Sequence, residues 1–397
     1  MAPKSAIVFG ASGVSGWAFV NQLLNDYPSQ GTWGQVHALF NRPLSREKLV
    51  WPNTERLSIV SGVDLLGSSQ EELTATLKSQ VPGIEKVTHA YFLAYKASLT
   101  DALQEVRDNE KLLRQAITAL DSLAPTLEFV VLQHGGRYYG LHLGEDRPTD
   151  GIFPPYKENM PMIPQPFRDE LFYYAQLEWL ESYAADKKWG WCETRPDIVI
   201  GFAPGHNAYN LAATIGVFCS LFREIHGEGA ECPYPGTAKS WKAIWSSSSS
   251  DMLARQAIHV SLTPPYSQQK GEAYNGADSL EPSTWSERWP AICSYFGLKG
   301  VKLEADDPIE MRAFIKENHK AWESMEKKYD LQRGFAERPF QVPTWEHAMV
   351  SGMDFDRPYD VSKIYGTGFT QETTTLQTWS PVFERMRGAR VIPSSFT

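Results

Sequence analysis

The chain has 397 residues, which is enough for one large domain or two. Its 47 acidic residues outnumber its 38 basic residues, and the net charge of −9 argues against a general nucleic-acid binder, because phosphate backbones require clustered Lys and Arg. Apolar residues make up 42%, as is usual for a globular protein with a packed core. The longest apolar stretch, residues 211–222, is well short of the roughly 20 residues that span a bilayer, so we expect no membrane span.

The cysteines and the N-terminal residues bear on the compartment. Cys192, Cys219, Cys232 and Cys293 are scattered and form no CxxC pair, so the sequence suggests neither a disulfide framework nor a zinc site, and we expect no metal. Residues 5–10 have the pattern of a buried strand, with no secretory signal before them. Both features predict a reduced, cytoplasmic environment.

The N-terminal half alternates strand-like apolar runs with helical patterns, which predicts an α/β fold with a doubly wound parallel sheet of the Rossmann type. The expected strands are Ala6–Phe9, Gln35–Phe40, Leu57–Val60, Ala90–Leu93, Phe129–Leu132 and Trp191–Thr194. The expected helices are Gly16–Leu24, Leu103–Leu120 and Glu170–Ala185.

Beyond Gly201 the pattern is less regular. We expect a helix at 211–222, a Gly- and Pro-rich loop at 227–240, and a serine run at 246–250 whose last residues cap a helix at 251–260. A short strand at 273–276 is expected to return to the sheet, and the rest of the C-terminal part to be mainly helical.

These elements suggest two domains. The first is a dinucleotide-binding Rossmann domain, residues 1–204, with a returning segment at 246–280. The second is a smaller, mainly helical substrate-binding cap, residues 205–245 and 281–397.

A glycine-rich turn lies between the first expected strand and the first helix. Gly10, Gly13 and Gly16 have the GxxGxxG spacing of short-chain dehydrogenases. The first glycine permits a tight turn, the second lets the backbone approach a pyrophosphate, and the third allows close packing of helix on strand. Together with Ser12 and Val14, they form the expected phosphate-binding turn, which in this strand–helix context is a strong signal for a nucleotide site.

The end of the second strand distinguishes NADP from NAD. An acidic residue there would bind the ribose 2′-hydroxyl, but the sequence has Asn41 and Arg42 instead. Arg42 can pair with a 2′-phosphate through two hydrogen bonds, so we expect NADP(H) as the cofactor. The alternative is a solvated surface arginine.

Other residues at strand ends are expected around the cofactor, because ligands of open α/β sheets bind at the carboxyl ends of the strands. Asp64 and Leu65, after the third strand, are placed to contact the adenine. The remaining cofactor-binding candidates are Ala94, Gln133, Pro196, Ile198 and Val199.

Several segments together resemble one family, the progesterone 5β-reductase/iridoid synthase-like (PRISE) enzymes, an atypical branch of the extended short-chain dehydrogenases. The resemblance covers essentially the whole chain. The segments that carry it are Gly10–Gly16, Asn41–Pro43, Val87–His89, Leu132–Tyr139, Phe172–Tyr174 with Glu178, Arg195–Phe202, Glu272–Asn275 and, less distinctly, Gly368–Pro393.

The resemblance implies NADPH-dependent reduction of the C=C bond of an enone or enal. In the family, a tyrosine and a lysine hold the carbonyl oxygen as it becomes an enolate. The tyrosine corresponds to Tyr173, with Tyr174 as the less favoured choice, and the lysine position corresponds to Arg137.

The sequence departs from the family at this point. The family's Gln-Thr-Gly-x-Lys segment here carries His134 and Arg137. Arg137 could stabilise an oxyanion or bind a substrate carboxylate through its planar guanidinium, and the departure from lysine favours the carboxylate. A cationic Arg137 near Tyr173 would also lower the pKa of that phenol. His134 is either a group that titrates near neutral pH in the site or a histidine satisfied by a backbone carbonyl. An aromatic residue faces the nicotinamide in the family, and Trp345 is the nearest match, with Tyr95 as a second candidate for the substrate pocket.

Three functions remain open from the sequence. The first is an NADPH-dependent reductase of an activated C=C or C=O bond in a small apolar metabolite, which could carry a carboxylate. The second is a cyclase, isomerase or pericyclase of specialised metabolism on the same fold, which the change from lysine to Arg137 favours. The third is a cofactor-sensing regulatory protein. The sequence gives no oligomeric state, and a homodimer is left open.

Overall fold

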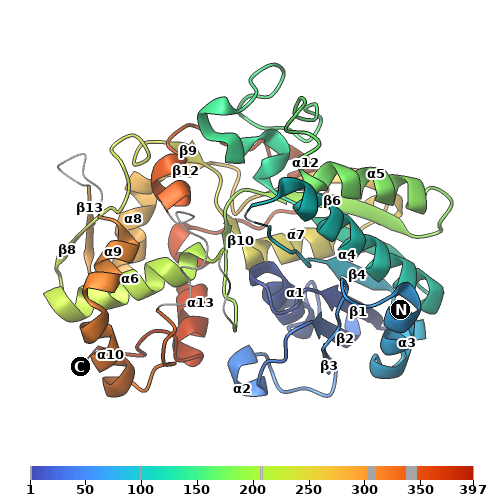
Figure 1. The fold of residues 1–397 in the computed structure, drawn as a ribbon, viewed down its shortest axis with the longest axis horizontal. Coiled ribbons are helices and arrows are strands. Elements are labelled where there is room, and N and C mark those ends of the chain that lie inside the picture. The colour runs from blue at the N-terminus through green and yellow to red at the C-terminus, as the bar shows by residue number, and fades with distance from the viewer. Residues whose placement is uncertain are drawn as a thin grey trace.

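The computed structural model describes residues 2–98, 100–205, 207, 209–302, 309–336 and 347–396. At its centre is a seven-stranded sheet in the order β11-β6-β5-β4-β1-β2-β3. Every neighbouring pair in it is parallel, which confirms the predicted doubly wound sheet (Figure 1). The strands are β1 (Lys4–Phe9), β2 (Trp33–Phe40), β3 (Leu57–Ser61), β4 (His89–Phe92), β5 (Phe129–Gln133), β6 (Gly190–Pro196) and β11 (Lys270–Gly276).

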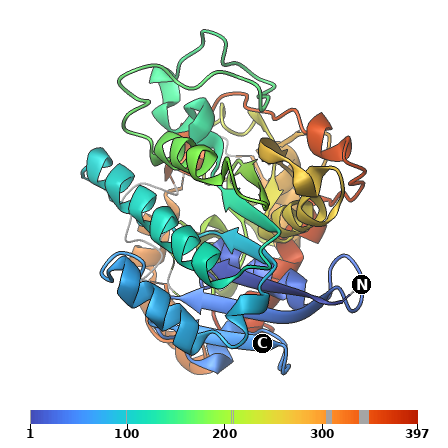
Figure 2. The same cartoon turned by 90° about the vertical axis from the view of Figure 1, so that its right-hand side faces the viewer.

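Both faces of the sheet are covered by helices, as its nearly continuous apolar strands require. In β1, Ala6 and Val8 pack with the helices of one face, while Ile7 and Phe9 pack with those of the other. Figure 2 shows these two layers on opposite sides of the sheet. One layer contains α1 (Val14–Leu24) and α7 (Ser250–Leu262), and the other contains α3 (Gln70–Gln80), α4 (Ala102–Leu123) and α5 (Phe172–Ala184).

The sequence pattern predicts most of these elements but not α3. Its apolar positions are few, since only Leu73 and Leu77 are buried. The helix begins with a capping box, in which Ser69 accepts a hydrogen bond from the Glu72 backbone and the Glu72 carboxylate accepts one from the Ser69 backbone. This signal was readable at the sequence level.

After β6 the chain leaves the central sheet, and it returns to the sheet at β11. Ser249 caps α7 by accepting a hydrogen bond from the Met252 backbone, as the serine run predicts. β11 then pairs with β6 and places Asn275 beside Arg195, which confirms the predicted returning strand. Two short strands, β7 (Val199–Ile200) and β10 (Ser248–Ser249), pair just beyond the end of β6.

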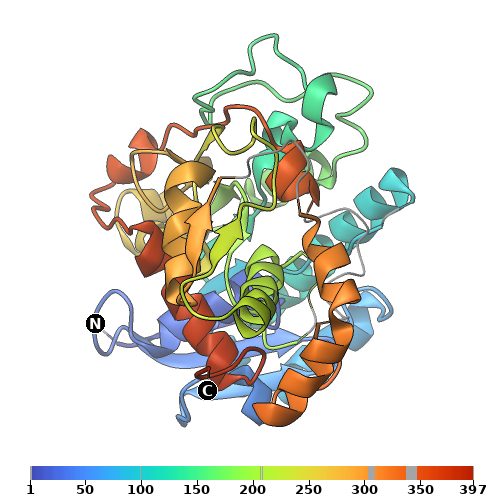
Figure 3. The same ribbon diagram turned by 90° about the vertical axis from the view of Figure 1, so that its left-hand side faces the viewer.

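Most of the remaining described residues form a second, mainly helical lobe beside the sheet (Figure 3). The helices of this lobe are α6 (Leu211–His226), α8 (Trp285–Tyr295), α9 (Met311–Glu317), α10 (His319–Lys328) and α13 (Thr375–Gly388). The predicted loop at 227–240 contains a short strand, β8 (Glu231–Pro233), which pairs with β13 (Lys299–Val301), and β9 (Ile244–Trp245) pairs with β12 (Ser283–Thr284). The short helix α12 (Ser362–Tyr365) lies beside β11 of the central sheet, where Lys363 pairs with Glu272 (Figure 1).

Short segments complete the described chain. These are α2 (Arg46–Leu49), η1 (Ile84–Lys86), η2 (Gly136–Tyr139), η3 (Leu141–Asp146), η4 (Tyr266–Gln268) and η5 (Ala348–Gly352). Among the helices in the described ranges, none combines the length and apolar character that crossing a membrane requires.

Candidate active site

The glycine turn has the tight geometry that its spacing predicts. Gly10 has a φ of +80°, and a Cβ added there would lie 2.7 Å from the Ala94 nitrogen and from the Leu93 oxygen. A Cβ on Gly16 would lie 2.1 Å from the Gly10 oxygen. A side chain at either position would therefore push β1, β4 and α1 apart, which explains both glycines by sterics alone.

The N-terminus of α1 is open to an anion. Gly13 is its N-cap residue and provides no side-chain cap, and the first turn contains no acidic residue. The helix nevertheless presents unpaired backbone N–H groups and the positive end of its dipole at this point. Ser12 and Val14 flank Gly13, so the turn is suited to a pyrophosphate.

Arg42 lies on the surface at the end of β2. Both Asn41 and Arg42 are exposed, and no hydrogen bond or ion pair joins the Arg42 guanidinium to another described residue. The neighbouring Arg46, in contrast, donates to the Asn53 side chain. Arg42 is therefore the cation at this strand end that can turn toward a ligand.

Asp64 has a structural role that the sequence did not reveal. Its carboxylate accepts hydrogen bonds from the backbone N–H groups of Leu66 and Gly67, at 3.0 and 2.9 Å. These bonds lower its pKa and fix the turn after β3. Leu65 is buried within this turn. The turn lies at the carboxyl edge of the sheet, where the adenine contact was expected.

The other cofactor candidates lie at the same edge. Ala94 lies just beyond the end of β4, and its backbone nitrogen packs closely against Gly10. The Gln133 amide, at the end of β5, donates to the Ser15 hydroxyl at 2.7 Å and so joins β5 to the start of α1. Pro196 ends β6, and Ile198 and Val199 follow in the segment that pairs with β10.

Tyr173 lies beside the end of β5 with a free hydroxyl. Its ring is buried and stacks on the His134 ring, with centroids 4.2 Å apart and planes 15° from parallel. A Cβ on Gly135 would lie 3.4 Å from the Tyr173 hydroxyl, so the glycine leaves room there. No described residue forms a hydrogen bond with this hydroxyl.

Tyr174 differs from its neighbour. Its hydroxyl donates to the Tyr138 carbonyl at 2.8 Å and accepts from the Ile163 backbone at 3.0 Å. Both interactions are buried and fix the loop before α5. Of the two tyrosines, only Tyr173 has a hydroxyl available for a substrate.

The pKa of Tyr173 differs from the sequence-based expectation. Arg137 lowers it, as expected, but burial raises it more, and Glu105 and Glu193 add to the increase. The net effect is a pKa raised to about 12. The Tyr173 phenol is therefore a protonated hydrogen-bond donor at neutral pH.

His134 is buried between two acceptors. Its Nδ1 lies 2.7 Å from a Glu193 carboxylate oxygen, and its Nε2 lies 2.9 Å from the Gln176 amide oxygen. The Gln176 amide is oriented by its own Nε2, which donates to the Asn109 carbonyl at 2.6 Å. His134 thus has a buried side-chain partner at each ring nitrogen. A side-chain carboxylate and an amide satisfy it, instead of the backbone carbonyl considered from the sequence.

Glu193 connects His134 to Arg195. The Arg195 Nε donates to the second Glu193 oxygen at 2.8 Å, and both side chains are buried. Burial alone would raise the pKa of Glu193, but Arg195 and His134 outweigh it and hold that pKa at about 2. The three side chains form a buried hydrogen-bonded network, and the His134 ring of this network stacks on Tyr173.

The depressed pKa of Glu193 predicts a specific acid sensitivity. A carboxylate with a folded-state pKa of about 2, below its ordinary 4.5, stabilises the fold above pH 4.5 and loses that contribution as the pH falls toward 2. We expect the difference in thermal stability between wild type and Glu193→Gln to be constant above about pH 5 and to shrink below about pH 4. Thermal denaturation at several pH values tests this, and a difference that is the same at every pH would contradict it.

Arg137 is already paired. Its NH2 lies 3.1 Å from one oxygen of Glu105, and its NH1 lies 3.4 Å from the other, so the planar fork faces a carboxylate of this chain. Glu105 lies on α4 and also accepts a hydrogen bond from the Tyr95 hydroxyl. Tyr95 stacks on Phe172 at 5.5 Å, and the Arg137 guanidinium lies 5.9 Å from the same ring. A cluster of one basic, one acidic and one aromatic side chain thus lies next to Tyr173: Arg137, Glu105 and Tyr95.

The sequence did not show the partners of these side chains. Glu105 and Asn109 are one turn apart on α4, but nothing in a helical pattern shows that Glu105 meets Arg137 and that Asn109 meets Gln176. Glu193 carried a readable signal, since a carboxylate in the middle of an apolar strand requires a buried partner. The other candidate for the substrate wall, Trp345, lies outside the described residues.

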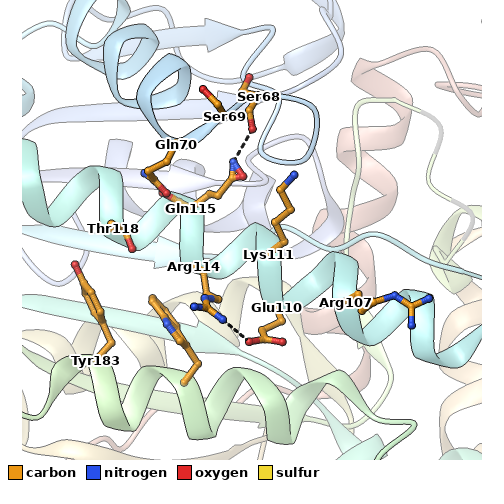
Figure 4. A pocket seen from close by; sticks show the side chains of 11 residues that line it. Ser68, Ser69, Gln70, Arg107, Glu110, Lys111, Arg114, Gln115, Thr118 and Tyr183 are labelled. Carbon is orange, nitrogen blue, oxygen red and sulfur yellow. Dashed lines mark hydrogen bonds and ion pairs between the residues drawn. The ribbon is translucent and has the colours of Figure 1, made fainter.

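A cavity of about 620 Å³ lies away from this site (Figure 4). Arg107, Lys111 and Arg114 of α4 line it, together with the start of α3 and with Tyr183 of α5. None of its lining residues belongs to the predicted site. Glu110 and Arg114, one turn apart on α4, form an ion pair of 2.9 Å in the cavity lining.

The parallel doubly wound sheet and the glycine turn between β1 and α1 are those of a Rossmann domain, and the named relatives reported below make this an oxidoreductase-type enzyme of the short-chain dehydrogenase class. The chain belongs to the PRISE-like Rossmann-fold domain family, whose sequence model matches residues 6–393. This confirms the family resemblance.

Comparison with individual proteins agrees with this assignment. The chain is 35% identical to the short chain dehydrogenase ausT of Aspergillus calidoustus, over 98% of this chain and 94% of that protein. It is 25% identical to the 3-oxo-Delta(4,5)-steroid 5-beta-reductase of Arabidopsis thaliana, over 98% and 93% of the two chains. Among solved structures, UDP-glucose 4-epimerase of Thermus thermophilus, in complex with NAD, superposes with a TM-score of 0.56 at 15% identity, over 97% and 99% of the two chains. That likeness shows the shared fold.

Proposed function

We propose that this protein is an NADPH-dependent reductase of an activated C=C or C=O bond in a small apolar metabolite. The observation that carries the proposal is the Tyr173 hydroxyl of α5, which is protonated, has no partner in the described chain and lies against Gly135, just after the end of β5. Relatives named as a short chain dehydrogenase and as a steroid 5-beta-reductase support the reaction class.

The residues around the turn fit the cofactor. The open N-terminus of α1 and the crowding at Gly10 and Gly16 match a pyrophosphate lying against the backbone. Arg42 supplies a free cation for the 2′-phosphate of NADPH. When bound, NADPH supplies the hydride of the reaction.

Arg42 should decide the cofactor preference. In Arg42→Ala we expect NADPH binding to weaken by about 1.5–3 kcal/mol, the usual value for a hydrogen bond to a charged group, while NADH binding stays the same. Titration of both cofactors into wild type and variant measures this. Arg46→Ala is the matched control, because Arg46 is already bonded to Asn53. If the ratio of the NADPH and NADH dissociation constants were the same in Arg42→Ala as in wild type, Arg42 would not be the residue that binds the 2′-phosphate.

Tyr173 is the proposed catalytic donor. Its Oη donates a hydrogen bond to the carbonyl oxygen of the substrate and stabilises the negative charge that develops there. The Arg137 guanidinium, on the same side, adds a positive field, as its effect on the Tyr173 pKa indicates. His134 acts through Tyr173: its buried ring supports the phenol face and fixes its direction.

The pairing of Arg137 with Glu105 bears on the substrate. Because the Arg137 guanidinium already faces the Glu105 carboxylate, it is not free to bind a second carboxylate. We therefore propose a substrate with a neutral carbonyl group at this position. This revises the preference for a carboxylate clamp that the sequence favours. Tyr95, Phe172 and Tyr209 supply aromatic surface for an apolar skeleton.

Variants of Arg137 and Glu105 test this revision. We expect Arg137→Lys to retain substantial turnover, because the charge that acts on Tyr173 is kept, and Arg137→Ala to lose more. We expect wild type to show similar KM values for the free acid and the methyl ester of one enone, and Glu105→Gln, which frees the fork, to favour the acid. Steady-state kinetics with the acid–ester pair measures this. A wild-type preference for the acid would restore the carboxylate clamp.

The alternative is a cyclase or isomerase on the same fold, since a hydrogen-bond donor alone can activate a carbonyl group. The replacement of the family lysine by Arg137 favours it. NADPH absorbance, followed with a panel of enones, enals and ketones, separates the two. Oxidation of NADPH that depends on the substrate supports the reductase, and product formation without oxidation supports the alternative.

A further inference from the structure

Three of the four cysteines meet in the second lobe, far from the glycine turn in sequence. Cys219 lies on α6, Cys232 on β8 and Cys293 on α8, and these elements lie together in Figure 1. Their sulfur atoms all lie within 4.8 Å of one another. All three side chains are fully buried.

Packing alone does not account for this cluster. A buried cysteine behaves as a small apolar side chain, and Ala or Val would serve the same purpose. The whole chain has only four cysteines, yet three of them, from three separate segments, converge on one point. The surrounding structure also holds them in place, since the Trp289 indole donates to the Cys232 carbonyl at 2.9 Å.

We propose that Cys219, Cys232 and Cys293 form a closed binding site for a thiophilic metal ion, Cu(I). Three sulfurs at about 2.3 Å from one ion lie roughly 4 Å apart, so only small side-chain shifts are needed. Soft thiolate ligands select Cu(I) and Zn(II). Structural Zn(II) sites take four ligands, and the described residues place only three donors here, which favours Cu(I).

The location indicates a stabilising role. A site without solvent access has no open position for a substrate, as in structural metal centres. An ion bound to three sulfurs would link α6, β8 and α8 and release the thiol protons as it binds. This role is independent of the reductase proposal. The sequence suggested no metal because the cysteines are far apart along the chain.

The test is anaerobic titration of the reduced, full-length protein with Cu(I), against a competing chelator. We expect uptake of one ion per chain, the ultraviolet charge-transfer absorption of Cu(I)–thiolate bonds, and a higher Tm. Cys219→Ser and Cys293→Val should lose the ion, the absorption and the Tm increase. Cys192→Ala, at the buried cysteine of β6 outside the cluster, should retain all three.

Native mass spectrometry of wild type alone provides a check that needs no variant to fold. One tightly held copper per chain supports the site, and no copper beyond a nonspecific amount overturns it. In the titration of the variants, copper retained in Cys219→Ser also overturns it. Zn(II) bound with the same cysteine dependence overturns the choice of ion, and a disulfide within the cluster in freshly isolated protein overturns the metal site itself.

Discussion

Tyr173→Phe should lower kcat by about 10²–10³, the usual loss when one donor to a developing oxyanion is removed. The substitution deletes only the hydroxyl, so the ring still stacks on His134, and NADPH binding should change little. Steady-state kinetics and cofactor titration measure the two effects separately.

Tyr174→Phe is the matched control, because it removes the adjacent phenol hydroxyl from the same helix. That hydroxyl bonds to Tyr138 and to the Ile163 backbone, so its loss should lower Tm and leave kcat of the folded enzyme nearly unchanged. Wild-type turnover in Tyr173→Phe, with a large loss in Tyr174→Phe, would mean that the tyrosines are misassigned.

Glu193→Gln should destabilise the fold by about 3–5 kcal/mol, because it leaves the buried Arg195 guanidinium without its carboxylate. Denaturant unfolding at neutral pH measures the loss. We also expect kcat to fall more than KM rises, since the displaced His134 ring would no longer hold Tyr173 in position.

An exposed ion pair on the neighbouring strand provides the comparison. Glu272 pairs with Lys363, and both side chains are more than a third exposed. Glu272→Gln should therefore change stability by less than about 1 kcal/mol. If the two Glu→Gln variants were equally stable, the buried network would contribute nothing beyond an ordinary surface pair.

Local patterns predicted the tight glycine turn between β1 and α1. Gly10, Gly13 and Gly16 lie within one short segment, so their spacing alone shows the turn, although Leu93 and Ala94, which crowd Gly10, come from the end of β4. The doubly wound parallel sheet also followed from the alternation of strands and helices, because parallel strands need helical crossovers.

The substrate half could not be predicted in the same way. Arg137 faces Glu105, and His134 faces Glu193 and Gln176, through contacts between residues far apart along the chain. Composition and periodicity indicate that such polar groups are buried but not which of them meet. The expected fall in the pKa of Tyr173 failed for the same reason, since the depth of burial outweighed the single charge that the sequence showed.

The cysteines illustrate the same limit on a larger scale. Cys219, Cys232 and Cys293 have no motif spacing, and only the packing of α6, β8 and α8 brings them together. A spacing rule detects metal sites built from one or two adjacent loops. It does not detect a site assembled from three separate elements.

Transfer of deuterium from labelled NADPH tests the central proposal most directly. The enzyme is incubated with an accepted enone and NADPH carrying deuterium at the transferable position, and the product is examined by mass spectrometry and NMR. The reductase account predicts one deuterium in each product molecule, at the β-carbon of a reduced C=C bond or at the former carbonyl carbon. A product that forms at full rate without deuterium, and without consumption of NADPH, would contradict it.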